Sequence, residues 1–214
     1  DEFAVLLTAF QTLLSGLSGR NDLVVTTTTN RRTKAEFANV VGFMGNLIAV
    51  RSAVADDVAF GRQVALANRA IGEALDHQEL HILLVVDELA DGKRDQYGNA
   101  DLGDTCFDQV ALCMLTPNLG DVPDAGLRLK YRLGETTKVG PYGLRLLPLE
   151  RSHTTRDLTV YFNEFDGEVA CFFAYSADVF DRATIEGMVA RLRTILTQGC
   201  ARPETSLRQL KPTA

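Results

Sequence analysis

The sequence contains no tryptophan and, among its 214 residues, only three histidines and four cysteines. The cysteines stand at positions 106, 113, 171 and 200, without the short paired spacing that a disulfide framework or a cysteine-ligated metal site needs. We therefore expect reduced thiols in a cytoplasmic protein, with Cys113 and Cys171 buried in apolar strands.

Long apolar runs and clusters of positive charge are also missing. No run approaches the ~20 apolar residues that cross a bilayer, and the net charge of -6 with scattered basic residues argues against a nucleic-acid partner. The chain lacks an initial methionine, and Asp1, Glu2 and Phe3 lead directly into a helical pattern that is not typical of a signal peptide. We expect a fragment of a longer protein, with neither a membrane nor a nucleic acid as its partner.

A self-sufficient catalytic set is absent as well. The sequence has no Gly-x-Ser-x-Gly elbow, no local Cys/His signature and no glycine-rich phosphate loop. His77 and His81 could place two imidazoles on one helix face, but no third ligand follows at a telling spacing. We interpret them as a polar helix N-terminus, expect His153 on a surface loop, and predict no metal site.

The residues that are present, 46% apolar and 23% charged, are typical of a globular domain. Hydrophobic periodicity predicts, in chain order, a helix over 3–17, strands over 23–29 and 40–51, a helix after Asp56 and Asp57, a short helix over 80–89, strands over 107–115, 127–133, 144–149, 158–165 and 169–175, and a closing helix. The Asp166–Gly167 pair is the strongest hairpin signal. This order predicts an α/β sandwich with a mixed sheet and helices packed against it.

The helix boundaries rest on capping and stop signals. Asp56 and Asp57 are expected to cap the second helix, and Asp181 or Thr184 to open the last one. Gly199 and Pro203 are expected to end that last helix. In the second helix the residues expected to face inward are Phe60, Val64, Ala67, Ile71 and Ala74. In the last helix they are Ile185, Met188, Val189, Leu192, Ile195 and Leu196. Arg31 and Arg32 are interpreted as solvated loop charges.

Four stretches resemble a known family. The segment Val41–Arg51, VGFMGNLIAVR, resembles the motif (I/V)GxFVNTxxxR of condensation domains. Residues 21–32 are similar to that family's GQxDIVVGTPxxNR segment, and 77–89 to its HQDxPFExLVEEL helix. Residues 156–181 match its closing pattern. In the family's order, residues 3–210 resemble the C-terminal lobe of a nonribosomal peptide synthetase condensation domain.

This resemblance implies a fold, a reaction and a set of partners. The fold is a chloramphenicol-acetyltransferase-like two-layer sandwich, and two such lobes enclose a tunnel. Carrier proteins deliver a donor thioester and an acceptor amine into it on phosphopantetheine arms, with no cofactor bound directly, and an amide forms. The catalytic histidine belongs to an HHxxxDG motif on the N-terminal lobe, so no catalytic residue is expected on this chain. The implied partners are the N-terminal lobe, both carrier proteins and the adjacent synthetase domains.

The resemblance also nominates residues for the tunnel or the lobe interface: Thr28, Arg32, Gly42, Asn46 and Arg51. Asn46 is equally compatible with a structural hydrogen bond that holds a bulge, and the two arginines with ion pairs at a surface or interface.

The chain departs from the family pattern at two of these motifs. The family's Val-Asn-Thr is Gly45-Asn46-Leu47 here, and its Pro-Phe is His81-Ile82. Ordinary condensation fits better than epimerization or cyclization, whose motifs read GWFT and GDFT. Two alternatives stay open: an inactive module that docks carrier proteins, and a CoA-dependent acyltransferase, whose usual Trp-containing motif is absent.

Overall fold

A mixed β-sheet forms the centre of the protein. The structure, a computed structural model, describes residues 1–37, 39–93, 109–114, 136–139, 141–145, 154, 156–165 and 168–212. In these ranges five strands pair in the order β2-β1-β3-β6-β7. They are β1 (Asp22–Thr29), β2 (Asn46–Ala53), β3 (Val110–Met114), β6 (Leu158–Phe165) and β7 (Glu168–Tyr175). β3 runs parallel to β1 and β6, whereas β1–β2 and β6–β7 are antiparallel, so the predicted mixed sheet is confirmed.

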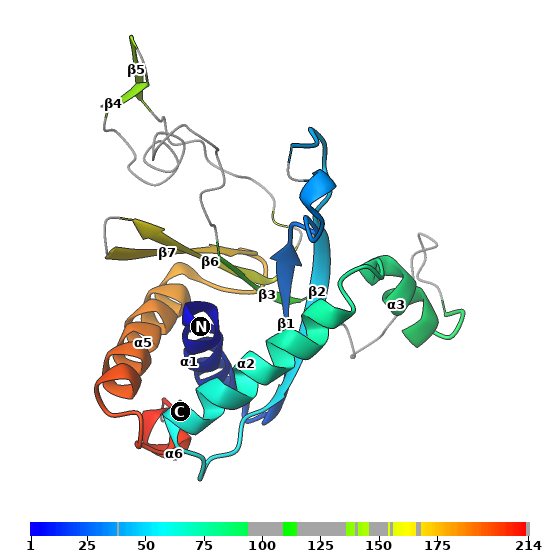
Figure 1. Ribbon diagram of the computed structural model, residues 1–214. Coiled ribbons are helices and arrows are strands. Elements are labelled where there is room, and N and C mark those ends of the chain that lie inside the picture. The colour runs from blue at the N-terminus through cyan, green and yellow to red at the C-terminus, as the bar shows by residue number, and fades with distance from the viewer. Residues whose placement is uncertain are drawn as a thin grey trace.

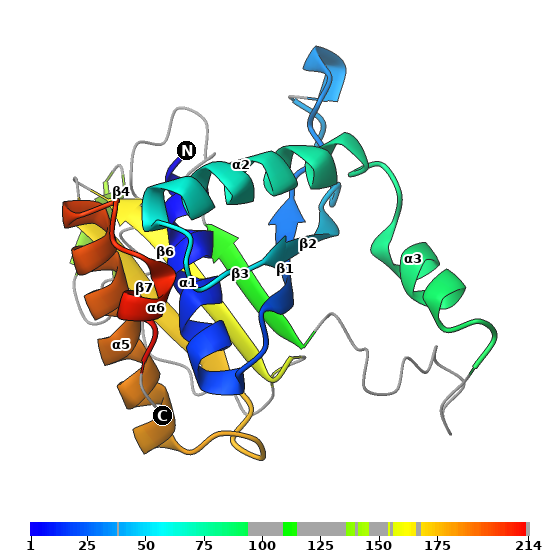
Figure 2. The same cartoon turned by 90° about the horizontal axis from the view of Figure 1, so that it is seen from below.

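Three long helices cover one face of this sheet (Figures 1 and 2). They are α1 (Glu2–Ser18), α2 (Phe60–Asp76) and α5 (Arg182–Ala201). Between them and the sheet lies a core of apolar side chains such as Phe10, Leu13, Val25, Val50 and Val160. The predicted α/β sandwich of two layers is therefore confirmed, and it follows from alternating apolar residues on the strands meeting helical stripes.

The smaller elements lie around this sandwich. They are η1 (Ala35–Phe37), α3 (Ile82–Leu89), β4 (Thr136–Val139), β5 (Tyr142–Arg145) and α6 (Leu207–Leu210). β4 and β5 pair with each other in a separate two-stranded sheet. The predicted hairpin strands are confirmed by the pairing of β6 with β7, while the Asp166–Gly167 turn, Cys106, His153 and the predicted strand 127–133 lie outside the described residues.

The start of α2 differs from the prediction. Asp56 and Asp57 do not cap it: its N-cap is Ala59, without a side-chain hydrogen bond. The C-terminal segment crosses this point instead, and the carbonyls of Thr205 and Pro203 accept from the amides of Phe60 (2.9 Å) and Gly61 (2.8 Å). Because backbone carbonyls already satisfy these orphan amides, the two aspartates are free to bind Lys211 and Arg208.

Gly199 does not end the last helix, which continues to Ala201. It is buried against Phe60, and a Cβ atom at position 199 would lie 2.8 Å from the ring. The glycine is therefore required for a close approach between two helices rather than for a stop. At the other end Asp181 caps the helix as predicted, accepting from the Thr184 amide at 2.7 Å.

Two burial predictions are wrong. Val189, predicted to face inward, is 43% exposed, because the buried stripe of α5 is narrower than its apolar residues suggest. Cys171 is an exposed free thiol on β7, the edge strand of the sheet, whereas Cys113 on the inner strand β3 is buried as predicted. The inward residues predicted for α2 are all buried or half-buried.

Candidate functional site: the junction of three motif segments

Three of the four segments that resemble family motifs, residues 21–32, 41–51 and 77–89, meet at one end of the sheet. The carboxyl end of β1, the loop that contains η1, the start of β2 and the turn between α2 and α3 are neighbours there (Figures 1 and 2). The predicted second strand begins only at Asn46, so residues 40–45 belong to the loop. Gly42 in this loop has a φ of 157°, a conformation that favours glycine.

Asn46 joins the start of β2 to the α2–α3 turn. Its side-chain amide donates to the carbonyls of Gln78 (2.9 Å) and Leu80 (2.7 Å), and its Oδ1 accepts from the Ile82 amide (3.4 Å). The residue is only 5% exposed, so these contacts replace water almost completely. Asn46 thus makes a structural set of hydrogen bonds, and they hold an interhelical turn rather than a bulge.

Two further contacts tie the same turn to the carboxyl end of β1. The Thr29 hydroxyl donates to Oε1 of Gln78 at 2.5 Å, and the Arg31 guanidinium binds the Glu79 carboxylate at 2.8 Å. The hydrogen bond from Arg31 holds the pKa of Glu79 below its usual value of 4.5, and the charge of Lys34 acts in the same direction. The sequence-based interpretation of Arg31 as a solvated charge is therefore wrong, since it is half-buried against an acidic partner.

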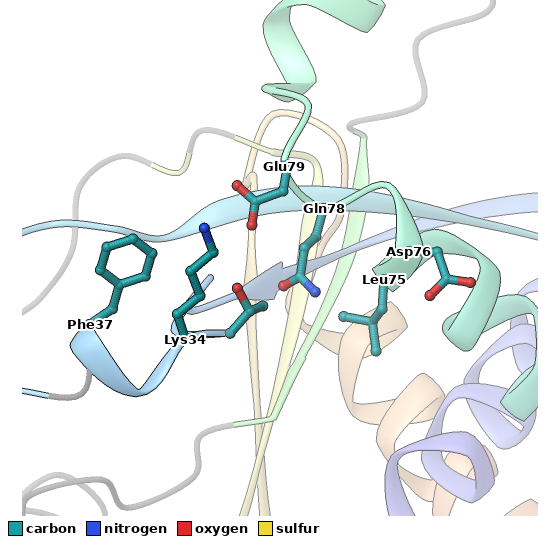
Figure 3. Close-up of a pocket in the computed structure, with 7 residues that line it drawn as sticks. Lys34, Phe37, Leu75, Asp76, Gln78 and Glu79 are labelled. Atoms are coloured by element: carbon teal, nitrogen blue, oxygen red, sulfur yellow. The ribbon is translucent and has the colours of Figure 1, made fainter.

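A pocket of about 540 Å³ opens between the η1 loop and this turn. Figure 3 shows Lys34 and Glu79 pointing toward one another across it, with the Phe37 ring on one side and Leu75 on the other. Asp76, Gln78 and Thr33 complete the lining. Two carboxylates, one ammonium group and an apolar wall suit the binding of a ligand with both polar and apolar parts.

Arg32, the second arginine of the loop, shapes the loop itself. Its guanidinium donates to the carbonyls of Phe37 and, at 3.4 Å, of Gly42. These bonds connect the η1 turn to the glycine of the family motif. Arg32 is half-buried and not a solvated charge, and its contacts are to backbone oxygens.

Arg51 lies outside this junction. Arg51 sits toward the far end of β2 and forms a two-point ion pair with Asp22, at 2.9 and 2.6 Å. That hydrogen bonding lowers the pKa of Asp22 and raises the pKa of Arg51, and both side chains are exposed. Thr28 lies at the carboxyl end of β1, within the junction, and is exposed opposite Leu47 of β2. Of the five nominated residues, the structure thus places Thr28, Arg32, Gly42 and Asn46 at the junction and Arg51 away from it. That any of the five lines a tunnel stays a prediction.

The two histidines that the structure describes act as helix-end residues. His77 is the C-cap of α2, and His81 is the N-cap of α3, where its Nδ1 accepts from the Leu83 amide at 3.3 Å. The prediction of a polar helix N-terminus is confirmed for His81.

Within the described ranges, no group of three or more His, Cys, Asp or Glu side chains is placed to hold a metal ion. None of the described helices combines the length and apolar character that a bilayer crossing requires.

Sequence reasoning missed most of the pocket. Arg31 and Glu79 are 48 residues apart, and a single opposite-charge pair at that separation carries no local pattern. Lys34 and Phe37 lie in a loop where neither helical nor strand periodicity applies. A possible signal was that the pocket lies between two of the segments that resemble family motifs.

Solved structures share this fold. A four-domain nonribosomal peptide synthetase, holo-AB3403 bound to AMP and glycine, superposes with a TM-score of 0.79 and 23% identity over 98% of this chain and 15% of its own. The first condensation domain of the CDA synthetase gives 0.65 and 15% over 96% of this chain and 41% of its own. The X-domain from teicoplanin biosynthesis gives 0.72 and 20% over 97% and 43%.

Sequence comparison gives the same family. Chondramide synthase cmdD of Chondromyces crocatus is 29% identical over 94% of this chain, and phosphinothricin tripeptide synthetase PhsB of Streptomyces viridochromogenes is 29% identical over 91%. The chain spans only 5% and 15% of these two proteins. The family model of the condensation domain matches residues 3–213. This chain belongs to the condensation domain family.

Proposed function

We propose that this chain is the C-terminal lobe of a condensation domain that forms an amide between carrier-bound thioesters in a nonribosomal peptide synthetase. One observation carries the proposal: the family match covers residues 3–213, yet the chain spans only about two fifths of solved condensation domains, 41% and 42% of two of them. A match that nearly fills the chain but leaves most of the domain unaccounted for supports one lobe rather than a whole domain.

The proposed division of labour follows from the side chains. Amide formation needs a group that accepts or orients the proton of the attacking amine. His77 and His81 are engaged at helix ends, and the sequence has no adjacent histidines. We assign the proton chemistry to the HHxxxDG histidine of the N-terminal lobe. This chain would supply one wall of the tunnel. The candidate contacts are Thr28, Arg32, Gly42 and Asn46 at the junction, and Arg51 farther along β2.

The proposed partners follow from the same interpretation. They are the N-terminal lobe, the donor and acceptor carrier proteins with their phosphopantetheine arms, and the adjacent synthetase domains, all in the cytoplasm. Phosphopantetheine arrives as part of the substrate, and we propose no cofactor bound directly to this chain.

A second candidate is an inactive module of the same fold that only docks other proteins. One observation favours it: a fold relative, the X-domain from teicoplanin biosynthesis, occurs in a complex with OxyB and superposes with a TM-score of 0.69 at 21% identity. The CoA-dependent acyltransferase alternative is weaker, because the chain has no tryptophan for that group's usual motif.

The test is amide formation by the intact domain, expressed from the gene with its upstream sequence and supplied with loaded donor and acceptor carrier proteins. We expect product by mass spectrometry, and its loss when the second histidine of the upstream HHxxxDG motif becomes alanine. If the intact domain binds carrier proteins but makes no amide, the docking module is correct and our proposal is wrong.

A further inference from the structure

The pocket between the η1 loop and the α2–α3 turn has a charged group of opposite sign on each side. Lys34 and Phe37 come from the η1 side, whereas Leu75 and Asp76 come from the last turn of α2 (Figure 3). Its volume of about 540 Å³ lies in the range of pockets that hold small organic ligands. Which ligand fits depends on which of these charges the protein already neutralises.

The carboxylate of Glu79 is already engaged by the protein. Arg31 binds it at 2.8 Å, and the hydrogen bond from Arg31 is the main reason that the pKa of Glu79 is lowered, with smaller contributions from Lys34 and Thr33. Glu79 therefore stays ionised and paired. The Arg31–Glu79 pair cancels its own charge and forms part of the pocket wall.

Two charges in the pocket remain without an ion-pair partner among the described residues. The ammonium group of Lys34 lies 5.9 Å from the centroid of the Phe37 ring, which forms an apolar wall beside it. Asp76 is exposed and is the last residue of α2. On one side the pocket thus offers a free cation, and on the other a free carboxylate.

The position of Asp76 is unfavourable for its own helix. The carboxyl end of a helix carries partial negative charge, which favours cations there and disfavours a carboxylate. α2 has no basic residue in its last turn that could compensate. Asp76 and the helix end therefore reinforce each other as a binding point for a positive group, and a residue that breaks a local rule in this way is often retained for function.

We infer that this pocket binds a small zwitterion with an apolar side chain, either a free apolar amino acid or a short peptide of such residues. Its ammonium group binds at Asp76 and the carboxyl end of α2, and its carboxylate binds Lys34. The apolar side chain lies between Phe37 and Leu75. A purely anionic ligand would meet the charge of Asp76 and a purely cationic one that of Lys34, and like-charge contacts are unfavourable.

The free carboxylate distinguishes this ligand from a carrier-bound acyl group. In a thioester the carboxyl carbon is bonded to sulfur and carries no negative charge, so it offers no anion to Lys34. The inference therefore goes beyond the proposed function. It assigns to this lobe a site for the free compound, and it does not depend on amide formation.

The test is isothermal titration calorimetry on the intact condensation domain. The probes are leucine, the dipeptide of two leucines, and two charge-blocked forms of each, one acetylated at the nitrogen and one amidated at the carboxyl group. We expect saturable binding of at least one zwitterion and about tenfold or more weaker binding of both its blocked forms, since each loses one charged contact. Binding of leucine alone assigns the site to an amino acid, and binding of the dipeptide alone assigns it to a peptide.

Two variants assign the charges. Lys34→Ala should weaken binding of the zwitterion about tenfold, while the amidated form, a cation, binds as before or more tightly. Asp76→Asn should do the same for the zwitterion and spare the acetylated form. Arg20→Ala and Asp178→Asn remove one charge of each sign from exposed positions outside the pocket, and they should leave every affinity unchanged.

Three results would overturn the inference. The first is that neither zwitterion binds saturably at millimolar concentration. The second is that the blocked forms bind as tightly as the zwitterion, which would show that the charges are not read. The third is full affinity in both Lys34→Ala and Asp76→Asn, which would place the ligand elsewhere in the domain.

Discussion

Replacing Asn46 with alanine should loosen the junction more than any surface change of similar size. The variant leaves the carbonyls of Gln78 and Leu80 and the amide of Ile82 without their partner. An ordinary hydrogen bond contributes about 0.5–1.5 kcal/mol net, and the two bonds at 2.9 and 2.7 Å should count fully while the third, at 3.4 Å, counts less. The sum predicts a loss of about 2–3 kcal/mol in the free energy of unfolding.

Urea denaturation followed by circular dichroism measures this loss, with Asn68→Ala on the exposed face of α2 as the control. Asn68 is exposed, so its replacement should change stability by no more than about 0.5 kcal/mol. In a thermal scan each kcal/mol lost should lower Tm by roughly 2–4 °C for a chain of this size. Hydrogen exchange should speed up first at residues 78–84. Equal stability of the two variants would refute the assignment of Asn46 as the link between β2 and α3.

Three other changes test the packing and the ion pairs. Gly199→Ala should destabilise the protein by about 1–3 kcal/mol, because the new Cβ would lie 2.8 Å from the Phe60 ring; an unchanged unfolding midpoint would contradict this. Gly187→Ala, on the same helix with open space around it, should instead raise stability by about 0.5–1 kcal/mol. The hydrogen bond from Lys211 lowers the pKa of Asp56 below 3.8. Asp56→Asn should therefore lower Tm at neutral pH, and the difference in Tm between variant and parent should shrink as the pH falls below 3.8. A Tm difference that does not change with pH would show that the negative charge of Asp56 does not contribute to stability.

The sandwich could be predicted from the sequence because its signals are local. Phe60, Ala67 and Ile71 recur at helical spacing and do face the core. β6 and β7 pair as the predicted hairpin strands, and Asp181 caps the helix that follows. Each of these features involves residues within a few positions of each other, where periodicity and capping chemistry act directly.

The errors arose where distant segments decide the structure. Asp56 looks like a helix cap, yet the backbone of residues 203–205 already satisfies the first amides of α2, and the carboxylate binds Lys211 instead. Gly199 looks like a helix stop, yet its lack of a side chain serves Phe60, 139 positions away in the chain. Neither partner is visible in a sequence window around the residue itself. The pocket could not be predicted for the same reason, since its two sides come from residues 33–37 and residues 75–79, which lie far apart in the chain.

The departures from the family motif are compensated locally, which explains why the junction keeps its form. Where the family has proline the chain has His81, and its φ of -69° lies within the range that proline imposes. Its Nδ1 accepts from the Leu83 amide, so a side-chain cap replaces the rigidity of the ring. Ile82, in place of phenylalanine, is still buried. Because Asn46 binds backbone atoms of this turn, it depends on the path of the chain and not on those side chains. The motif residues retained here therefore act first on loop geometry, and any effect on substrates must pass through the position of the η1 loop and α3.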